Sequence, residues 1–191
     1  MRNEIKFRSC PLCGSNNVLL LFPSTSTIPR FAEQIKVTEK YFGLHGDIVR
    51  CTKCGFIYVG KELYVKKIIR LYEMMSDDVY LQEEKERSLS FIGVIRTLEN
   101  LRQGAKGKIL DVGCCTGGLL VEAQKRGWEG YGVDPSIWAF RIAKRLHGLD
   151  VYNGSLESFN LPSQRFNAIT LLDVLEHVED PKLLMHKIHA L

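Results

Sequence analysis

A short segment in the middle of the chain combines an acid and three glycines in a pattern that suits the binding of a nucleotide-like ligand. The segment runs from Lys108 to Leu120 and reads KILDVGCCTGGLL. An apolar run ends at Asp111, the glycines follow, and apolar residues at helical spacing come directly after them. This order predicts a strand, a tight turn and a helix N-terminus, where backbone N–H groups can hold the polar groups of a ligand.

The segment resembles motif I of class I S-adenosylmethionine-dependent methyltransferases, whose usual form is D-x-G-x-G-x-G. The motif positions here are Asp111, Gly113, Cys115 and Gly117, so a cysteine stands where the middle glycine is usual. The resemblance implies that this turn, which also contains Cys114, contacts the cofactor. Because glycine tolerates a positive φ angle at such a turn, we expect Cys115 to reduce cofactor affinity or to alter the turn.

A second acid, Asp134, follows the next expected strand in the segment GVDPS, with Pro135 beside it. An acid at this place can accept hydrogen bonds from both ribose hydroxyls of a nucleoside. NAD-binding proteins share it, so Asp134 does not separate hydride transfer from methyl transfer. Asp111 favours methyl transfer, because an NAD fingerprint normally carries an apolar residue there. Asp134 could also cap the helix that follows.

Three further segments extend the resemblance. It implies that Ser155 and Leu156 lie at the adenine edge of the cofactor, although an acid is more common at the serine position. Asp173, in a segment similar to motif IV, would lie beside the transferred methyl group. His177 is either a general base, since imidazole titrates near neutral pH, or a structural histidine. Tyr80, in a segment similar to a lid helix of such enzymes, would touch cofactor or substrate; the alternative is that this segment only supplies packing helices that join the two modules.

Two C-x-x-C pairs, each followed by glycine, occupy the N-terminal third of the chain: Cys10 with Cys13, and Cys51 with Cys54. Each pair is typical of a zinc knuckle, and four thiolates suit a closed tetrahedral Zn²⁺ site. Short β-type segments around the pairs, at 18–22, 48–50 and 56–59, predict a zinc ribbon with an inserted loop or short helix near 30–42. Buried or redox-active thiols are the alternative. Catalytic zinc is disfavoured, because four protein ligands leave no open position.

The rest of the chain alternates between helical and strand patterns. Residues 61–103 predict two amphipathic helices separated by a break at 76–78. Expected strands after motif I are 130–133, 151–152 and 166–172, the last buried on both faces, and expected helices are 119–126, 136–147 and one that begins near Pro181. The predicted class is α/β: a Rossmann-like, doubly wound, mostly parallel sheet with a small N-terminal zinc ribbon. The expected divisions are 1–60 for the ribbon, 61–104 for a helical linker or lid, and 105–191 for the cofactor domain.

The number of strands is lower than the resemblance implies. A complete class I domain has seven strands, and four can be recognised before the last residue. The expectation is therefore a chain truncated at its C-terminus, with an open sheet edge that a second copy could cover to form a homo-oligomer.

Composition narrows the choice of function. The chain has 191 residues, of which 45% are hydrophobic and 25% charged, as in ordinary globular proteins. The net charge of +4 is not gathered into a dense basic stripe, which argues against nucleic acid as a partner. The N-terminus has no signal-peptide pattern and no apolar run approaches membrane-spanning length, so a cytoplasmic protein is expected.

The combined prediction is a small-molecule methyltransferase that uses S-adenosylmethionine, releases S-adenosylhomocysteine and carries a structural zinc ion. The segment similar to motif IV lacks the N-P-P-[YF] form of nucleic-acid amino-methyltransferases, which favours an oxygen or carbon acceptor. The pairing of modules is similar to sugar C-methyltransferases, and the catalytic half is similar to ubiquinone-type O-methyltransferases. An RNA methyltransferase that docks RNA on the ribbon and a non-catalytic scaffold protein remain alternatives.

Overall fold

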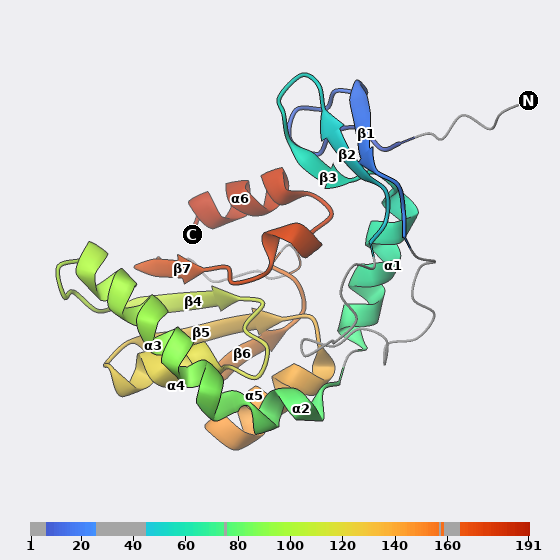
Figure 1. The fold of residues 1–191 in the computed structure, drawn as a ribbon. Coiled ribbons are helices and arrows are strands. Elements are labelled where there is room, and N and C mark those ends of the chain that lie inside the picture. Colours follow the sequence, from blue (N-terminus) through green and yellow to red (C-terminus); the bar gives the residue numbers. More distant parts are fainter. Residues whose placement is uncertain (1–6, 26–44, 75, 157, 159–164) are drawn as a thin grey trace, which may run out of the picture.

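The computed structural model describes residues 7–25, 45–74, 76–156, 158 and 165–191, which form two sheets joined by helices (Figure 1). A three-stranded antiparallel sheet comes from the N-terminal part, and a four-stranded parallel sheet with helices makes up the larger part. Among the described helices, none has the length and apolar content needed to cross a membrane.

The small sheet consists of β1 (Val18–Phe22), β2 (Ile48–Cys51) and β3 (Ile57–Val59), in that order. All three strands fall on segments that the sequence predicts. Their core is very small, since its fully buried members are Cys10, Val49, Cys51 and Tyr58. Such a module therefore depends on an additional cross-link for its stability. The loop or helix expected near 30–42 lies outside the described residues.

The linker contains α1 (Glu62–Glu73), α2 (Asp78–Gln82) and α3 (Glu84–Leu101). The break predicted at 76–78 is present, because the carboxylate of Asp77 accepts a hydrogen bond from the Tyr80 N–H (3.2 Å) and starts a new helix there. The prediction of two helices was incomplete. A separate short helix, α2, precedes α3 and carries Tyr80.

The parallel sheet has the strand order β6-β5-β4-β7. The strands are β4 (Lys108–Val112), β5 (Glu129–Asp134), β6 (Asp150–Asn153) and β7 (Ala168–Thr170). From β4 the chain adds two strands on one side and then crosses over to place β7 on the other side. The loops after β4 and β7 therefore meet at a switch point, where open α/β sheets bind their ligands.

Helices cover both faces of this sheet (Figure 1). They are α4 (Gly118–Lys125), α5 (Ile137–His147) and α6 (Pro181–His189). Ile95 of α3, Leu120 of α4 and Ala143 of α5 share one buried cluster, whereas Leu184 of α6 belongs to a second cluster with Leu110. The predicted doubly wound α/β class is confirmed.

The last strand differs from its prediction. Instead of 166–172, β7 spans only Ala168–Thr170, and two of its three residues are half-buried. Within the described sheet β7 is an edge strand, so it has one neighbour, β4, rather than two. The apolar run at 166–172, predicted as one strand buried on both faces, forms a short strand followed by a loop. Its residues Phe166, Ile169 and Leu171 pack against the buried cluster that contains Leu184.

Candidate functional site

A cleft of about 1920 Å³ opens at the carboxyl ends of the parallel strands. Its walls come from the turn after β4, the ends of β5 and β6, the loop after β7, helices α1 to α3, and the first cysteine knuckle. Ligand pockets typically measure roughly 300–1,000 Å³, so the cleft has room for two ligands. The residues of the predicted site that line it are Tyr80, Asp111, Gly113, Cys114, Cys115, Asp134, Pro135, Ser155, Leu156, Asp173 and His177.

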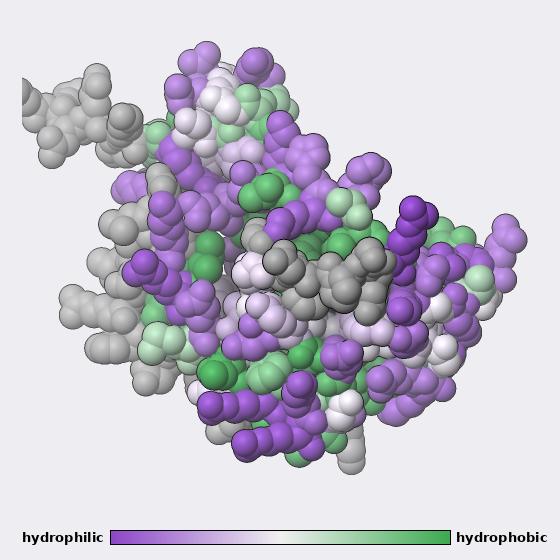
Figure 2. All heavy atoms as spheres, turned by 180° about the vertical axis from the view of Figure 1, so that it is seen from behind, coloured by the Kyte–Doolittle hydropathy of each residue, from purple (hydrophilic) through white to green (hydrophobic). Residues whose placement is uncertain are grey.

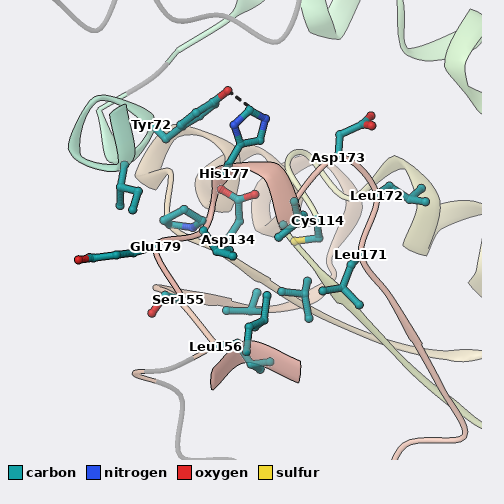
Figure 3. Close-up of a pocket in the computed structure, with 18 of the residues that line it drawn as sticks. Tyr72, Cys114, Asp134, Ser155, Leu156, Leu171, Leu172, Asp173, His177 and Glu179 are labelled. Carbon is teal, nitrogen blue, oxygen red and sulfur yellow. Dashed lines mark hydrogen bonds between the residues drawn. The ribbon is translucent and has the colours of Figure 1, made fainter. Parts of the chain in front are cut away.

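Asp134 is a buried carboxylate at the wall of this cleft (Figure 3). Its oxygens accept one hydrogen bond each, from the N–H groups of Ser136 and Cys115, both at 2.8 Å. Each carboxylate oxygen can accept two, so Asp134 retains capacity for two hydroxyl donors. Burial raises its pKa to about 6. The alternative role as helix cap is wrong, because the Ser136 hydroxyl caps α5 by accepting from the Ala139 N–H.

Asp111, at the end region of β4, is also buried and accepts a short hydrogen bond from the Thr170 hydroxyl of β7 (2.6 Å). This bond ties the two strands that flank the switch point. Burial raises the pKa of Asp111 to about 7, and the charge of Asp134 adds to the effect. Near neutral pH a large fraction of Asp111 is therefore protonated, whereas an exposed aspartate is ionised.

Replacing Asp111 with asparagine is expected to stabilise the ligand-free protein at about pH 8. The folded pKa lies above the unfolded value, so the stability that this group contributes is present at low pH and lost as the pH rises through about 7. Asparagine keeps the acceptor for Thr170 but carries no charge. We expect a gain of at least about 1 kcal/mol, or roughly 2–4 °C in Tm, measured by thermal unfolding.

The gain should shrink steadily as the pH is lowered from about 8 toward 4, where the folded wild-type protein holds the proton. An Asp111→Asn variant whose advantage over wild type does not change with pH would show that the buried charge is not its source.

The turn after β4 keeps a glycine-type backbone even though its middle residue is a cysteine. Cys115 has a φ angle of 48°, in the left-handed region that Gly113 also occupies with 74°. This φ angle favours the expectation of reduced cofactor affinity over that of an altered turn, and both stay predictions. Burial raises the pKa of the Cys115 thiol to about 12, so it stays neutral. Its N–H, not its side chain, makes the contact with Asp134.

Gly117 is the one residue of the predicted cofactor set that does not line the cleft. A Cβ atom at this position would lie 2.1 Å from the Leu149 side chain and 3.5 Å from that of Ala143. With φ at 88° it also forms the N-cap of α4. Glycine is required at position 117 because the start of α4 packs closely against Ala143 of α5 and against Leu149, which follows α5.

A β-branched residue at position 115 should expose the strain in this turn. We expect Cys115→Val to cost at least about 1 kcal/mol more than Cys115→Ala, because a left-handed backbone is unfavourable for branched side chains. Urea unfolding of the two variants measures the difference. Equal stability of the valine and alanine variants would contradict the left-handed assignment.

His177 lies in the short helix η2 (Leu175–His177) and faces Tyr72 of α1 (Figure 3). The Tyr72 hydroxyl and His177 Nε2 are 3.5 Å apart, and the ring centres are 5.0 Å apart. Burial lowers the pKa of His177, which leaves the imidazole neutral at neutral pH. The two residues are 105 positions apart, so the sequence offered no local signal for this pair.

Arg87 of α3 is a cleft residue that sequence reasoning missed. Its guanidinium lies 4.3 Å from the centre of the Tyr80 ring, and Nη2 donates to Glu83 (2.7 Å). Its Nε atom is buried, with no hydrogen-bond partner among the described residues. Tyr80 is itself buried, which raises its pKa above the ordinary value. Together they form an aromatic and cationic wall next to Cys115.

The other predicted residues are more exposed. Asp173 has a φ angle of 54° and points away from Asp134 (Figure 3). Ser155 is exposed, whereas Leu156 beside it is buried against the α6 side of the sheet. Seen from behind, apolar surface is exposed between hydrophilic regions below the N-terminal module (Figure 2).

The four cysteines of the two pairs form a cluster in which all Sγ atoms lie within 4.8 Å of one another. The Sγ atoms of Cys10 and Cys54 are 3.7 Å apart, and those of Cys13 and Cys51 are 3.6 Å apart. A tetrahedral site with Zn–S bonds of about 2.3 Å places its sulfurs about 3.8 Å apart, close to these distances. The predicted four-cysteine cluster is confirmed, and its donor set fits a metal ion.

The knuckle turns explain why these thiols suit a cation. Gly14 donates to the Cys10 carbonyl (2.8 Å) and Gly55 to the Cys51 carbonyl (2.9 Å), closing two equivalent turns. The N–H groups of Cys54 and then Lys53 stabilise the thiolate of Cys51 and lower its pKa to about 6, whereas burial and the neighbouring sulfurs raise the pKa of Cys54 to about 12. The opposite shifts arise because thiolates in contact repel one another, and a bound cation removes this repulsion. Thiolate is the form that binds zinc.

The fold and the site together define an α/β protein with a cleft at the switch point of a parallel sheet. A profile for the methyltransferase domain matches residues 80–191, more than half of the chain, and the chain belongs to this family. The N-terminal module precedes the matched range.

Curated relatives agree with the family. The chain is 42% identical over 84 residues to the mitochondrial ubiquinone biosynthesis O-methyltransferase of Schizosaccharomyces pombe, a match that covers 39% of this chain and 30% of that protein. It is 33% identical over 135 residues to the ubiquinone biosynthesis O-methyltransferase of Coxiella burnetii, covering 66% of this chain and 57% of that one. The chain thus spans only part of the length of these relatives.

Among solved structures, the plantazolicin methyltransferase BpumL in complex with a monoazolic desmethylPZN analogue and S-adenosylhomocysteine has a similar fold. The TM-score is 0.51 at 20% identity, and the match covers 64% of this chain and 47% of that one. This likeness supports the Rossmann-like architecture.

Proposed function

We propose that the chain binds S-adenosylmethionine in the cleft and transfers its methyl group to an oxygen or carbon of a small molecule, such as a sugar or a quinone-like compound. The observation that carries this proposal is Asp134, a buried carboxylate at the carboxyl end of β5 with spare acceptor capacity. Family membership and the relatives named as ubiquinone O-methyltransferases support the reaction class.

Each part of the cleft has a role in this proposal. Asp134 accepts the two ribose hydroxyls, and the turn at 113–115 lies along the amino-acid end of the cofactor. Ser155 and Leu156 border the adenine. Arg87, held over Tyr80, is the cation placed to receive a carboxylate, since a guanidinium pairs well with this group. Asp111 orients the turn through β4 and Thr170.

His177 is proposed as the general base for an acceptor with an acidic proton. Bound S-adenosylmethionine supplies a methyl group on a positively charged sulfur, so the protein must align the acceptor, exclude water and remove one proton. A neutral imidazole can take that proton as the acceptor oxygen or carbon forms its new bond. Tyr72 orients the ring of His177 from α1.

We propose that Cys10, Cys13, Cys51 and Cys54 bind structural Zn²⁺. Four protein sulfurs leave no open position, so the ion stabilises the module and takes no part in methyl transfer. The divisions proposed from the sequence, at 60 and 104, then separate the metal module, the helical linker and the cofactor domain.

Isothermal titration calorimetry of the zinc-loaded chain tests the proposal. We expect saturable binding of S-adenosylmethionine and S-adenosylhomocysteine, and no binding of NAD at the same concentrations. A thermal-shift series gives the same ranking, because a ligand that binds only the folded state raises Tm. NAD binding without binding of either sulfur nucleoside would refute the proposed activity.

A further inference from the structure

The first cysteine knuckle forms part of the cleft wall, although it precedes the family domain by more than sixty residues. Residues 8–14 line the cleft together with Tyr72 of α1 and with His177, Glu179 and neighbouring residues that lead into α6. The metal module therefore borders the side of the cleft where His177 lies.

Arg8, two residues before the first cysteine, connects the module to that side. Its Nε donates to the Val59 carbonyl of β3 (2.9 Å), and its Nη1 donates to the Glu179 carbonyl (3.1 Å). The guanidinium also lies 5.4 Å from the centre of the Tyr58 ring. One planar group thus joins two main-chain carbonyls, from segments 120 residues apart.

Arg8 is itself fixed by the small sheet. Its N–H donates to the Gly60 carbonyl (2.8 Å), and its carbonyl accepts from the Tyr58 hydroxyl (3.1 Å). Tyr58 belongs to the same buried cluster as Cys10 and Cys51. The geometry of the guanidinium therefore depends on the folded knuckles.

A second link from α1 reaches the same loop. Lys66 and the Glu179 carboxylate are 3.7 Å apart, with both side chains about half exposed. Exposed pairs of this kind contribute little to stability. Arg8 defines the position of the loop better, because one planar guanidinium bonds to both the Val59 carbonyl of β3 and the Glu179 carbonyl of the loop and so fixes direction as well as distance.

We propose that Arg8 is a positioning residue that fixes the His177 loop to the four-cysteine module, so that metal loading shapes the acceptor side of the cleft and leaves the cofactor side unchanged. This inference rests on the proposed function for the assignment of the two sides. The cofactor side is independent because Asp134 takes its hydrogen bonds from Cys115 and Ser136, both in the larger domain.

The test compares Arg8→Ala with Arg50→Ala, which removes an exposed arginine from β2 of the same module. Both variants are prepared as full chains loaded with zinc. Three quantities are measured: zinc content, affinity for S-adenosylhomocysteine by calorimetry, and amide hydrogen exchange of residues 174–180. Arg8→Ala should speed exchange of 174–180 about tenfold, with zinc content retained and affinity within about twofold of wild type. Arg50→Ala should match wild type in all three.

A spectroscopic readout separates positioning from general stability. Burial lowers the pKa of His177, against the opposing charges of Glu176 and Asp173. In Arg8→Ala the loop loses the hydrogen bond between Arg8 and the Glu179 carbonyl, and the His177 ring becomes more exposed to solvent. The NMR titration midpoint of His177 should therefore rise toward about 6.5. It should stay at the wild-type value in Arg50→Ala.

Zinc removal by a chelator provides an arm that needs no variant. It should accelerate exchange of 174–180 in wild type to the level of Arg8→Ala, and should add nothing further in Arg8→Ala, since both changes break the same link. Arg8→Lys should also exchange fast, because an ammonium cannot make both bonds in the geometry of a guanidinium.

Four results would each overturn the inference. They are wild-type exchange of 174–180 in Arg8→Ala, wild-type exchange of 174–180 in Arg8→Lys, exchange in Arg50→Ala as fast as in Arg8→Ala, and loss of zinc from Arg8→Ala. Failure of the proposed function gives a different result. In that case wild type does not bind S-adenosylhomocysteine, whatever the exchange of 174–180 shows.

Discussion

Replacing Asp134 with alanine is expected to weaken binding of S-adenosylhomocysteine by at least about 100-fold. The carboxylate is buried and has one free acceptor position on each oxygen. A hydrogen bond to a charged group is worth about 1.5–3 kcal/mol, so the loss of two corresponds to about 3–6 kcal/mol. Isothermal titration calorimetry at about pH 8 measures the change. S-adenosylhomocysteine is used as the ligand because it carries no methyl group to transfer.

Alanine also removes the acceptor for the N–H groups of Cys115 and Ser136, so Asp134→Asn is the companion variant. Asparagine retains one acceptor oxygen and the side-chain volume, and an intermediate loss is expected. Asp150→Ala removes an exposed aspartate at the amino end of β6, outside the cleft lining, so it serves as the matched control and should change affinity by less than about threefold. Wild-type affinity in Asp134→Ala would exclude the ribose role.

The affinity of the wild-type protein for S-adenosylhomocysteine should also fall as the pH is lowered. Hydroxyl donors favour the ionised carboxylate, so protonation of Asp134 opposes binding. Burial raises the pKa of Asp134 in the ligand-free protein to about 6. The contribution of Asp134 to the binding affinity should therefore be constant above about pH 7 and weaken below about pH 6. This dependence should vanish in Asp134→Ala.

Removal of the proposed zinc ion is expected to unfold the small sheet while the parallel sheet stays folded. Two of the four residues in the buried cluster of the module, Cys10 and Cys51, are members of the proposed ligand set. Structural zinc contributes about 10–16 kcal/mol of apparent binding energy in small metal modules, far more than so small a core supplies. Hydrogen exchange after chelation should show loss of protection in β1 to β3 and retained protection in β4 and β5.

Two serine variants provide the control. Cys13→Ser removes a cluster sulfur and should reproduce the effect of the chelator. Cys114→Ser changes a buried cysteine of the larger domain and should leave metal content unchanged. Full protection of the small sheet after complete metal removal would show that the sheet is stable without the ion.

The parts of the site that the sequence predicted are those with a local signal. Asp111 and Asp134 lie at the carboxyl ends of β4 and β5, and Gly113 follows β4 directly. Strand ends of a parallel sheet meet at one edge, so the proximity of these residues follows from the order of elements. The cysteine pairs are also local, since each knuckle is a turn of a few residues. Neither prediction required knowledge of how distant segments pack.

The parts that it did not predict depend on contacts between distant segments. Tyr72 meets His177, and Arg8 meets the Glu179 carbonyl, only because α1 and the small sheet lie against the loop after β7. The short length of β7 likewise depends on its place at the edge of the described sheet. An apolar run looks the same in a sequence whether it is covered by strands or by loops.

The cleft wall formed by the first knuckle has a practical consequence for work on the isolated family domain. A shortened chain that began at Tyr80, where the matched range begins, would keep Asp134 and the glycine turn but lack Arg8 and Tyr72. The side of the cleft that is proposed to hold the methyl acceptor would then be exposed to solvent. Such a fragment would be unsuited to a screen for the proposed methyl acceptor, and without Asp77 it would also lack the residue that caps α2.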